Sequence, residues 1–410
     1  MDQPLAPHTL FHDMGISRRR FLAGGTLAGI SAFLAACQAT TTPTLSPTAS
    51  ATPSAGASPT PVPRATPSAE LNWANWCCYM DVDPNDPTRW KTLEDFQAAY
   101  GTKVNYQEAV DANDTFFGTI KDALNADLDP GWDIIVLTDW MAARLIRLGW
   151  VEEFDLTNMP NFVANVRDPY KGLEWDPEMK RHAPWQSGIT GIGYDPSVTG
   201  PISSLKAFLT VDPRWKGRTE YLTEMRDAVG LTMLALGLDP TKPTRDGCDQ
   251  AVAAMLKARA DGIVRDVKGN AYTEDLKLGD AVLVMAWSGD IVQLKLEKPS
   301  LEFVIADEGA MFWTDNCLIP KGAAHKGTAE LMIDWVYVPE HAAQIEAGIS
   351  YVTPVEGVQE IFQQTAPELA TDPLRFPPAD QAGRLKQFGI LSEDDAAYFD
   401  EQFAKVIGVG

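Results

Sequence analysis

Aromatic and acidic side chains stand close together at four places in this sequence, and such groups can bind an organic cation. The four segments are Asn75-Trp76-Cys77-Cys78-Tyr79, Thr138-Asp139-Trp140, Trp287-Ser288-Gly289-Asp290 and Phe312-Trp313-Thr314-Asp315. The face of a tryptophan ring attracts a cation by about 0.5–2 kcal/mol, depending on desolvation. A carboxylate adds a charge-assisted hydrogen bond of about 1.5–3 kcal/mol. A box of aromatic rings with carboxylates at its ends therefore suits a protonated amine.

The sequence lacks the motifs that nucleophilic, phosphate-binding and metal-dependent enzymes use. It contains no G-x-S-x-G elbow, no G-x-x-x-x-G-K-S/T loop and no H-E-x-x-H pair. The acid pairs Asp394 with Asp395 and Glu224 with Asp227 are typical of solvated carboxylates at helix starts. A secreted hydrolase that uses such a pair in a cleft stays an alternative. We expect a binding protein that is not an enzyme and has no cofactor.

The elements that must position these residues alternate between strands and helices. Strands are expected at residues 71–76, 103–107, 133–137, 281–287 and 316–319, and helices at 88–100, 116–124, 227–237, 246–260, 328–336 and 394–406. Asn113 or Asp114 is expected to cap the helix over 116–124. The run from Asp133 to Leu137 is apolar on both faces, as in a parallel strand covered by helices. This alternation predicts an α/β fold with doubly wound topology.

The strand ends are where a ligand is expected to bind. In open α/β sheets, ligands collect in the crevice outside the carboxyl ends of the strands. Three of the four aromatic and acidic segments follow a predicted strand. A cluster of Gly188, Gly191 and Gly193 between two α/β blocks favours a chain crossover between two lobes. The sequence thus predicts a binding cleft between lobes.

The first 37 residues indicate export and lipid attachment. Ser17-Arg18-Arg19-Arg20-Phe21-Leu22 resembles a twin-arginine export signal, and Leu34-Ala35-Ala36-Cys37 resembles a lipoprotein cleavage box. The apolar run between them has about fourteen residues, fewer than the ~20 of a membrane-spanning helix. We expect cleavage before Cys37, lipidation of Cys37, and an extracytoplasmic protein anchored to the membrane. Residues 38–70, rich in Pro, Thr and Ser, are expected to form a disordered linker.

Composition and cysteine usage exclude several classes of partner. The net charge is −22 and no basic stripe is present, so we expect no nucleic-acid partner. His182, His325 and His341 are scattered and no C-x-x-C motif occurs, so we expect no metal site. Four cysteines remain after Cys37, namely Cys77, Cys78, Cys248 and Cys317, and their three possible pairings stay open.

The segments in their order resemble a known family. They are Asn75-Trp76 with Tyr79, Asp133 to Val136, Leu148-Gly149-Trp150-Val151, Trp287-Ser288-Gly289, Glu308 to Asp315, and Tyr351-Val352-Thr353-Pro354. Together they resemble the polyamine-binding proteins of spermidine/putrescine ABC importers, over nearly the whole chain beyond the linker. The resemblance implies a type II periplasmic-binding-protein-like fold, with residues 71–184 and 313–356 in lobe 1 and residues 185–312 and 357–410 in lobe 2. It also implies a monomer that captures putrescine or spermidine for an ABC permease.

The resemblance also implies site residues. Trp76, Tyr79, Trp287, Trp313 and Tyr351 would line the pocket around the ligand's methylene chain, Asp315 would hold an ammonium group, and Thr138 and Trp140 would lie near the other end. Two departures from the family pattern are visible. Cys78 stands where many members carry an acid, and Met225 and Ala228 stand where an acidic pair is expected, with Glu224 or Asp227 as substitutes. A receptor for another organic cation or for a sugar is therefore the alternative.

Overall fold

The computed structural model describes residues 65–83, 86–110 and 112–408. The expected lipidation site Cys37, the export signal and residues 38–64 of the expected linker lie outside the described residues. The last residues of the expected linker instead belong to the folded domain, because the Ser68 backbone donates a 2.8 Å hydrogen bond to Thr328 and Glu70 begins a strand. The strands are β1 (Glu70–Trp76), β2 (Val82–Asp83), β3 (Asp86–Trp90), β4 (Lys103–Val110), β5 (Ile134–Thr138), β6 (Ala183–Tyr194), β7 (Thr219–Leu222), β8 (Val264–Lys268), β9 (Leu283–Trp287), β10 (Glu302–Val304), β11 (Ala310–Leu318) and β12 (Leu385–Lys386).

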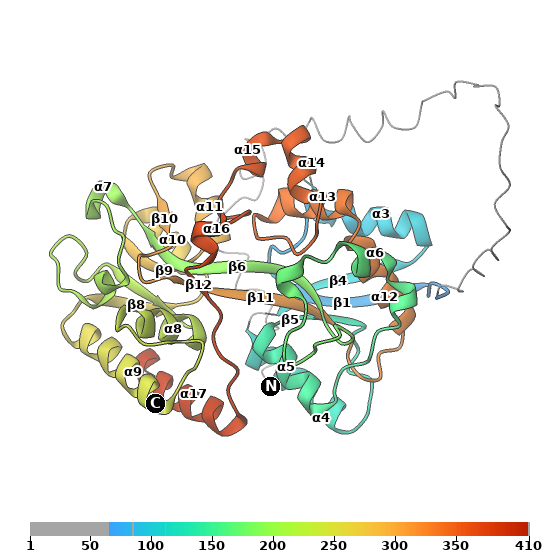
Figure 1. Cartoon of the computed structure of the whole chain (residues 1–410), viewed down its shortest axis with the longest axis horizontal. Helices are drawn as coiled ribbons and strands as arrows, with labels where there is room; N and C mark the ends of the chain where they lie inside the picture. Colours follow the sequence, from blue (N-terminus) through green and yellow to red (C-terminus); the bar gives the residue numbers. More distant parts are fainter. Residues whose placement is uncertain (1–64, 84–85, 111, 409–410) are drawn as a thin grey trace, which may run out of the picture.

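Helices cover the strands from both sides, as Figure 1 shows. In the first part of the chain they are α3 (Lys91–Tyr100), α4 (Asn113–Asn125), α5 (Asp139–Leu148), α6 (Pro160–Asn165) and α7 (Pro196–Thr199). The later helices are α8 (Met225–Ala235), α9 (Arg245–Ala260), α10 (Tyr272–Leu278), α11 (Ser288–Glu297), α12 (Lys326–Val336), α13 (Pro339–Ile349), α14 (Val358–Thr365), α15 (Pro367–Ala370), α16 (Ala379–Ala382) and α17 (Glu393–Ile407). Short 3-10 turns lie at Leu156–Asn158, Asp168–Tyr170 and Leu205–Leu209.

The main sheet has ten strands and runs through both halves of the molecule (Figure 1). Its order is β4-β1-β5-β11-β6-β9-β7-β8, with β10 and β12 added beside β6 and β11. β4, β1 and β5 are parallel on one side, and β8, β7 and β9 are parallel on the other. The strands of the two lobes therefore form one continuous sheet instead of two separate ones, because β6 and β11 pair with each other between them.

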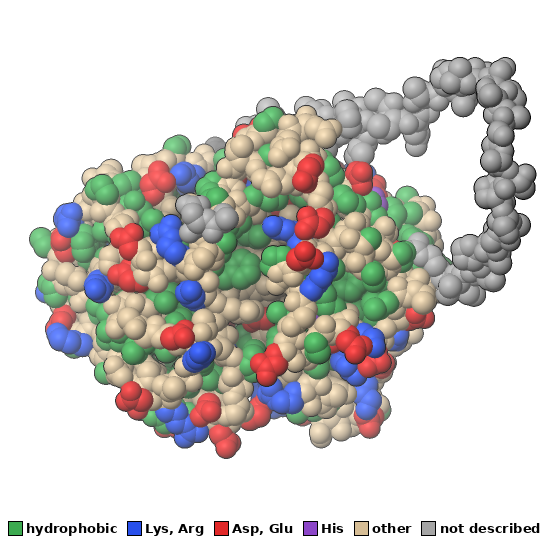
Figure 2. Space-filling view, in the orientation of Figure 1, with side chains coloured by type: hydrophobic (Ala, Val, Ile, Leu, Met, Phe, Trp, Pro, Cys, Tyr) green, Lys and Arg blue, Asp and Glu red, His purple; other side chains and the backbone are tan. Residues whose placement is uncertain are grey.

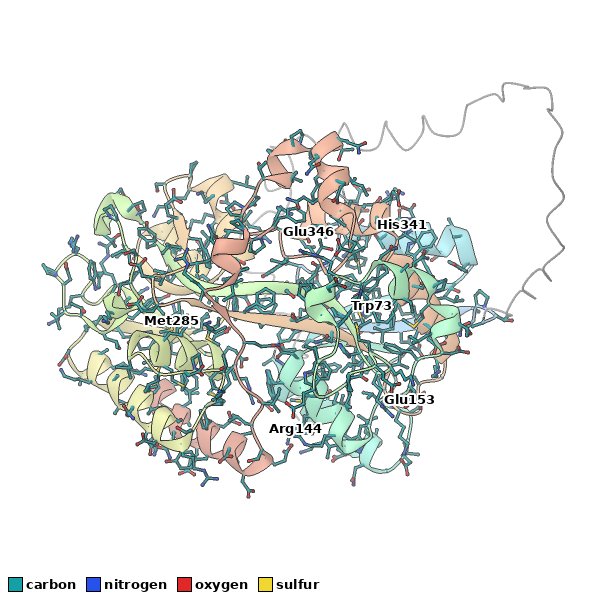
Figure 3. The ribbon with its side chains drawn as sticks, viewed as in Figure 1. Trp73, Arg144, Glu153, Met285, His341 and Glu346 are labelled. Carbon is teal, nitrogen blue, oxygen red and sulfur yellow. The ribbon has the colours of Figure 1, made fainter. Side chains whose placement is uncertain are left out.

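Each half has its own hydrophobic core. In β5, Ile134 and Val136 pack into one cluster and Ile135 and Leu137 into another, so alternate side chains face opposite sides of the sheet. This confirms the expectation that the strand is covered on both faces. The core of the other half is built around β7, β8 and β9. Figure 3 labels Trp73 in the first core and Met285 in the second.

The carboxyl ends of the parallel strands in both halves meet at the middle of the β6 and β11 pair. Thr138, the last residue of β5, pairs with Asp315 of β11, which in turn pairs with Gln186 of β6. Trp287, the last residue of β9, pairs with Thr190 of β6. The register of these strands therefore brings segments that are far apart in the sequence to one place.

Some expected elements differ from the structure. The strand expected at 316–319 belongs to the longer β11, and the helix expected from residue 88 begins at Lys91, because residues 86–90 pair with β2. The expected caps of α4 are wrong: the N-cap is Ala112, and the Asn113 side chain bonds to Thr138 instead. The sequence placed residues 357–410 in lobe 2. In the structure, α14 follows residue 357, and its Phe362 packs into the core of the first half.

No helix within residues 65–83, 86–110 and 112–408 is both long enough and apolar enough to cross a bilayer.

Candidate functional site

Asp315 lies where the strand ends of the two halves meet. Its side chain is only 4% exposed, and the Thr138 hydroxyl donates a 2.7 Å hydrogen bond to its Oδ1 atom. The Asn113 amide donates to the Thr138 hydroxyl over 2.9 Å, which leaves the hydroxyl hydrogen for Asp315. Burial raises the pKa of Tyr79, and the charge of nearby Asp315 adds to the rise, but the Tyr79 hydroxyl completes no hydrogen bond of ordinary geometry. The structure thus brings together Asp315, Thr138 and Tyr79.

Two aromatic rings beside this carboxylate lie directly against glycine residues. A Cβ atom on Gly188 would come within 2.2 Å of the Trp313 indole, and one on Gly289 within 2.6 Å of the Tyr351 ring. The Trp313 and Tyr351 ring centroids are 5.7 Å apart, and Tyr351 meets Tyr79 edge to face at 5.2 Å. The two glycines therefore allow a continuous aromatic wall to form next to Asp315.

The backbone around Tyr351 is held in place from two sides. Val352 exchanges two hydrogen bonds of 2.8 and 2.9 Å with Ser187 of β6. Ser350 has a φ angle of +64°, in the left-handed region, and its hydroxyl accepts a 2.6 Å hydrogen bond from buried Arg375. These contacts fix the direction in which the Tyr351 ring leaves the chain.

Trp287 and Asp227 form the part of the site that comes from the second half. The Trp287 indole nitrogen donates a 2.8 Å hydrogen bond to Asp227, which lies in the first turn of α8 and is 6% exposed. The Trp313 indole nitrogen donates over 3.0 Å to the Thr190 hydroxyl. Burial raises the pKa of Asp227, and the nearby Thr190 side chain offsets part of that rise. A line of polar contacts therefore links Trp313, Thr190, Asp227 and Trp287.

Two further carboxylates lie near this line. Asp139, the first residue of α5, is buried and accepts hydrogen bonds from the Gln387 amide and from its own neighbour's backbone. Asp290, in the first turn of α11, is half-buried and accepts a 2.7 Å hydrogen bond from the Tyr272 hydroxyl. The Tyr272 hydroxyl is oriented because it accepts a 3.0 Å hydrogen bond from the backbone of Trp287.

All four carboxylates resist ionisation because the protein removes water from around them. Burial raises the pKa of Asp315 to about 7, and the charges of Asp139 and Asp227 contribute to this rise. Burial raises the pKa of Asp139, Asp227 and Asp290 to about 6 each. The four acids therefore form a site whose electrostatic potential favours a cation.

Some acids buried elsewhere in the described part of this protein are paired with cations, and these four are not. Asp195 pairs with Lys298 at 2.8 Å, and Glu346 pairs with Arg375 at 2.9 Å. Within the described part of the chain, none of the four site carboxylates forms an ion pair within 4.0 Å. Glu346 is labelled in Figure 3, in the upper helices. A group of desolvated carboxylates without a close ion pair is costly for folding and is typical of a binding site.

The other predicted residues near the interlobe boundary surround an arginine. The Arg226 guanidinium stacks on the Trp140 ring, with its carbon 3.5 Å from the ring centroid. Glu224 precedes α8, is half-buried, and burial raises its pKa to about 7. Of the two expected substitutes, Asp227 lies with the line of polar contacts and Glu224 lies beside Arg226. Met225 and Ala228 are buried in the core of the second half.

A small pocket lies between the two halves next to this arginine. Its lining residues are Asp114, Trp140, Arg144, Arg147, Arg226, Ile390, Leu391, Glu393, Ala396 and Asp400. Arg144 is labelled in Figure 3 near the boundary of α5 and α17, and Figure 2 shows the surface hollowed between the two halves. The boundary of the halves is thus accessible on this side.

Trp76 and the cysteines lie at the side of the site. Trp76 packs between two core clusters of the first half and, among the described ring contacts, meets neither Tyr79 nor Trp313. The Sγ atoms of Cys77 and Cys78 are 2.8 Å apart, and the two side chains lie near Glu108 in a group of possible metal ligands. From the sequence we expected no metal site, and this group is not visible there because Glu108 lies 30 positions beyond Cys78. Cys248 and Cys317 are buried in different cores and are not disulfide-bonded.

Several residues of the site were not predicted individually. Asp139 and Asp290 were part of the aromatic and acidic segments, but only the aromatic neighbours were singled out. The same pattern of an acid beside a strand-end aromatic would have identified both. No sequence signal pointed to Thr190 or Arg226, because their roles depend on contacts between β6, α8 and α5.

The sequence model of the family described as "Bacterial extracellular solute-binding protein" matches residues 91–377 of this chain. The chain is 24% identical over 312 residues to the spermidine/putrescine-binding periplasmic protein of Escherichia coli K12, covering 76% of this chain and 84% of that protein. It is 23% identical over 341 residues to a putrescine/cadaverine-binding protein of Pseudomonas aeruginosa, covering 80% of this chain and 91% of that one.

Solved structures resemble the fold. The substrate-binding protein PotD of a Streptococcus pneumoniae spermidine/putrescine ABC transporter superposes with a TM-score of 0.69 at 19% identity, covering 83% of this chain and 98% of that one. The Tp0655 lipoprotein of Treponema pallidum superposes with a TM-score of 0.69 at 17% identity, covering 82% and 99%. The expected two-lobed, periplasmic-binding-protein-like α/β fold is confirmed.

Proposed function

Because this chain belongs to the bacterial extracellular solute-binding protein family, we propose that it captures a polyamine between its two lobes and delivers it to an ABC permease. The observation that carries the proposal is the group of four desolvated carboxylates, Asp139, Asp227, Asp290 and Asp315, which form no ion pair within 4.0 Å among the described residues. A ligand with more than one ammonium group would supply the missing charge. Membership of a family of binding proteins agrees with the expectation that the chain is not an enzyme.

The geometry suggests how an amine would be held. An ammonium group would bind the Asp315 carboxylate while Thr138 keeps that carboxylate in place. The rings of Trp313 and Tyr351 would pack against the methylene chain, since apolar carbon next to an aromatic wall loses contact with water. Asp227, which Trp287 orients, would meet a second ammonium group. Binding would then favour the closed arrangement of the lobes, because only that arrangement brings both sets of groups to the ligand.

A sugar receptor is the less favoured alternative. Tryptophan rings also stack on sugars, but neutral hydroxyl groups would not compensate four desolvated carboxylates. A hydrolase that uses Asp394 and Asp395 is disfavoured as well. The Asp395 carboxylate pairs with Arg245 at 2.7 Å and its backbone nitrogen is capped by Ser392 at 3.1 Å, so it serves the start of α17.

We also propose that Cys37 carries a lipid and that residues 38–64 tether the binding domain to the membrane. The support is the sequence Leu34-Ala35-Ala36-Cys37 behind the paired arginines Arg18 and Arg19. A tether would raise the local concentration of the receptor near its permease. Metabolic labelling with a radioactive fatty acid tests this, since a Cys37→Ser variant should lose the label.

Thermal unfolding of the purified chain tests the main proposal. Putrescine, cadaverine, spermidine, neutral amino acids and hexoses are added at increasing concentration. At a hundredfold excess over its dissociation constant, a true ligand stabilises the folded state by about 2.7 kcal/mol. We expect this shift with at least one polyamine and with none of the sugars. If no polyamine shifts the transition, the proposed function is wrong.

A further inference from the structure

One basic side chain, that of Arg226, lies between the two halves in surroundings that suit a ligand's ammonium group. Arg226 belongs to the first turn of α8 in the second half and is 8% exposed. Its guanidinium carbon is 3.5 Å from the centroid of the Trp140 ring, which belongs to α5 in the first half. The contact therefore crosses the boundary at which ligands bind in this fold.

Acidic residues surround Arg226, but none pairs with it at short range. The charges of Glu224, Asp400, Asp114 and Asp139 all act on the guanidinium. Among the described residues, none of these carboxylates lies within 4.0 Å of it, and its Nε atom has no hydrogen-bond partner. Arg226 is thus held by an aromatic face and by the field of several acids. An organic ammonium ion is bound by the same combination.

Neighbouring arginines show how unusual this arrangement is. Arg144 and Arg147, which line the same pocket, pair with Glu393 at 2.9 and 2.5 Å and are partly exposed. Arg226 is more buried than either and lacks such a pair. Its placement therefore serves something other than an ordinary surface ion pair.

Arg226 lies at one end of the row of carboxylates whose other end is Asp315. Asp227 follows it in the chain and accepts a hydrogen bond from Trp287. Asp139 precedes Trp140 in the chain, and its charge acts on both Arg226 and Asp315. Arg226 therefore neutralises one end of a row of acids and leaves the Asp315 end for the ligand.

We propose that Arg226 takes the place of one ligand ammonium group and restricts this receptor to short aliphatic diamines. The inference rests on the proposed function, since it names the class of polyamine bound at the same site. A diamine needs only Asp315 at one end and Asp227 with Asp290 near the other. The third ammonium group of a triamine would approach a guanidinium that already covers Trp140, and like charges repel.

Isothermal titration of the full chain with putrescine and with spermidine tests the proposal. We expect the wild-type protein to bind putrescine more tightly. In Arg226→Ala and in the milder Arg226→Gln, the ratio of the spermidine to the putrescine association constant should rise by about tenfold, as the loss of one cation at an aromatic face implies. Arg214→Ala is the matched control, because it removes an exposed arginine that lies 4.7 Å from the Trp215 ring centroid and outside the cleft. Its ratio should equal that of the wild type.

The possible results separate the two proposals. If the wild type and both variants bind neither amine, the proposed function fails. If the wild type binds spermidine as tightly as putrescine, or if the folded variants keep the wild-type ratio, the proposed function stands and the role of Arg226 is wrong. If Arg226→Ala does not fold, the ratio measured for Arg226→Gln tests the role of Arg226. If neither variant folds, the wild-type preference between putrescine and spermidine tests it.

Discussion

Replacing Asp315 by Asn should have opposite effects on the stability of the ligand-free protein and on ligand binding. Burial raises the pKa of this carboxyl from 3.8 to about 7. A carboxyl whose pKa is raised by folding binds its proton more tightly in the folded state, so its ionisation destabilises that state. The destabilisation is absent below pH 3.8, grows between pH 3.8 and 7, and is complete above pH 7. At ~1.4 kcal/mol per pKa unit, it reaches up to about 4 kcal/mol at pH 8.

The asparagine of the variant would have nearly the shape of the aspartate and would still accept the Thr138 hydrogen bond. We therefore expect the ligand-free Asp315→Asn protein to unfold several degrees higher than the wild type at pH 8, and at nearly the same temperature at pH 4. Polyamine binding at pH 8 should weaken by about 10- to 100-fold, because a charge-assisted hydrogen bond is lost. Differential scanning fluorimetry with and without putrescine measures both effects.

Asp195→Asn is the matched control for this prediction. Asp195 is 3% exposed, like Asp315, but it pairs with Lys298 at 2.8 Å, and this pair lowers its pKa against the effect of burial. Its replacement should lower the stability at pH 8 and leave polyamine binding unchanged. The reasoning about Asp315 is refuted if Asp315→Asn also lowers the stability of the ligand-free protein at pH 8, or if it keeps the full ligand-induced shift.

Three further predictions follow from the same site. Gly188→Ala places a Cβ atom within 2.2 Å of the Trp313 indole, so the ring must move. Titration calorimetry should show that polyamine affinity falls at least tenfold. Unchanged affinity would mean that the position of the Trp313 ring is unimportant for binding. Affinity measured from pH 5 to pH 8 should rise with pH, since Asp139, Asp227 and Asp290, with pKa values of about 6, and Asp315, with a pKa of about 7, attract a cation only when ionised. A flat profile would contradict the role of these acids. Glu393→Gln removes the 2.9 and 2.5 Å contacts to Arg144 and Arg147, which join α17 to α5. Because all three side chains are partly exposed, we expect polyamine affinity to fall by less than tenfold. Small-angle scattering should show a slightly larger radius of gyration.

Much of the fold was predictable because hydrophobic periodicity is a local property of the chain. The buried strand at 133–137, the helices that became α8, α9 and α17, and the α/β alternation all follow from the spacing of apolar side chains. The short strand β3 and the full length of β11 were not predicted. Their residues are not strongly periodic, and their conformation depends on pairing with distant strands.

The chemical type of the candidate site was predictable from the sequence, but the full set of residues that form it was not. The pattern of acids beside tryptophans at strand ends identified the segments, and the family resemblance then implied the individual aromatic residues and Asp315. The roles of Gly188 and Gly289 as supports for aromatic rings depend on side chains 125 and 62 positions further along the chain. Trp140 was expected to face the ligand, and the structure shows its ring covered by Arg226. The identity of that neighbour depends on how two helices from different halves pack.

The sequence by itself determined the class of this protein: an α/β chain with aromatic and acidic groups at its strand ends and no motif for covalent chemistry. These properties are determined by residue type and short-range spacing. The tertiary structure decided which acids share one desolvated site, and it placed the Arg226 guanidinium beside them. The pairing of β6 with β11 brings the strand ends of both halves together, and burial then raises the pKa values of Asp315 and its neighbours. Desolvation and charge coupling depend on distances through space, and only the folded chain sets those distances.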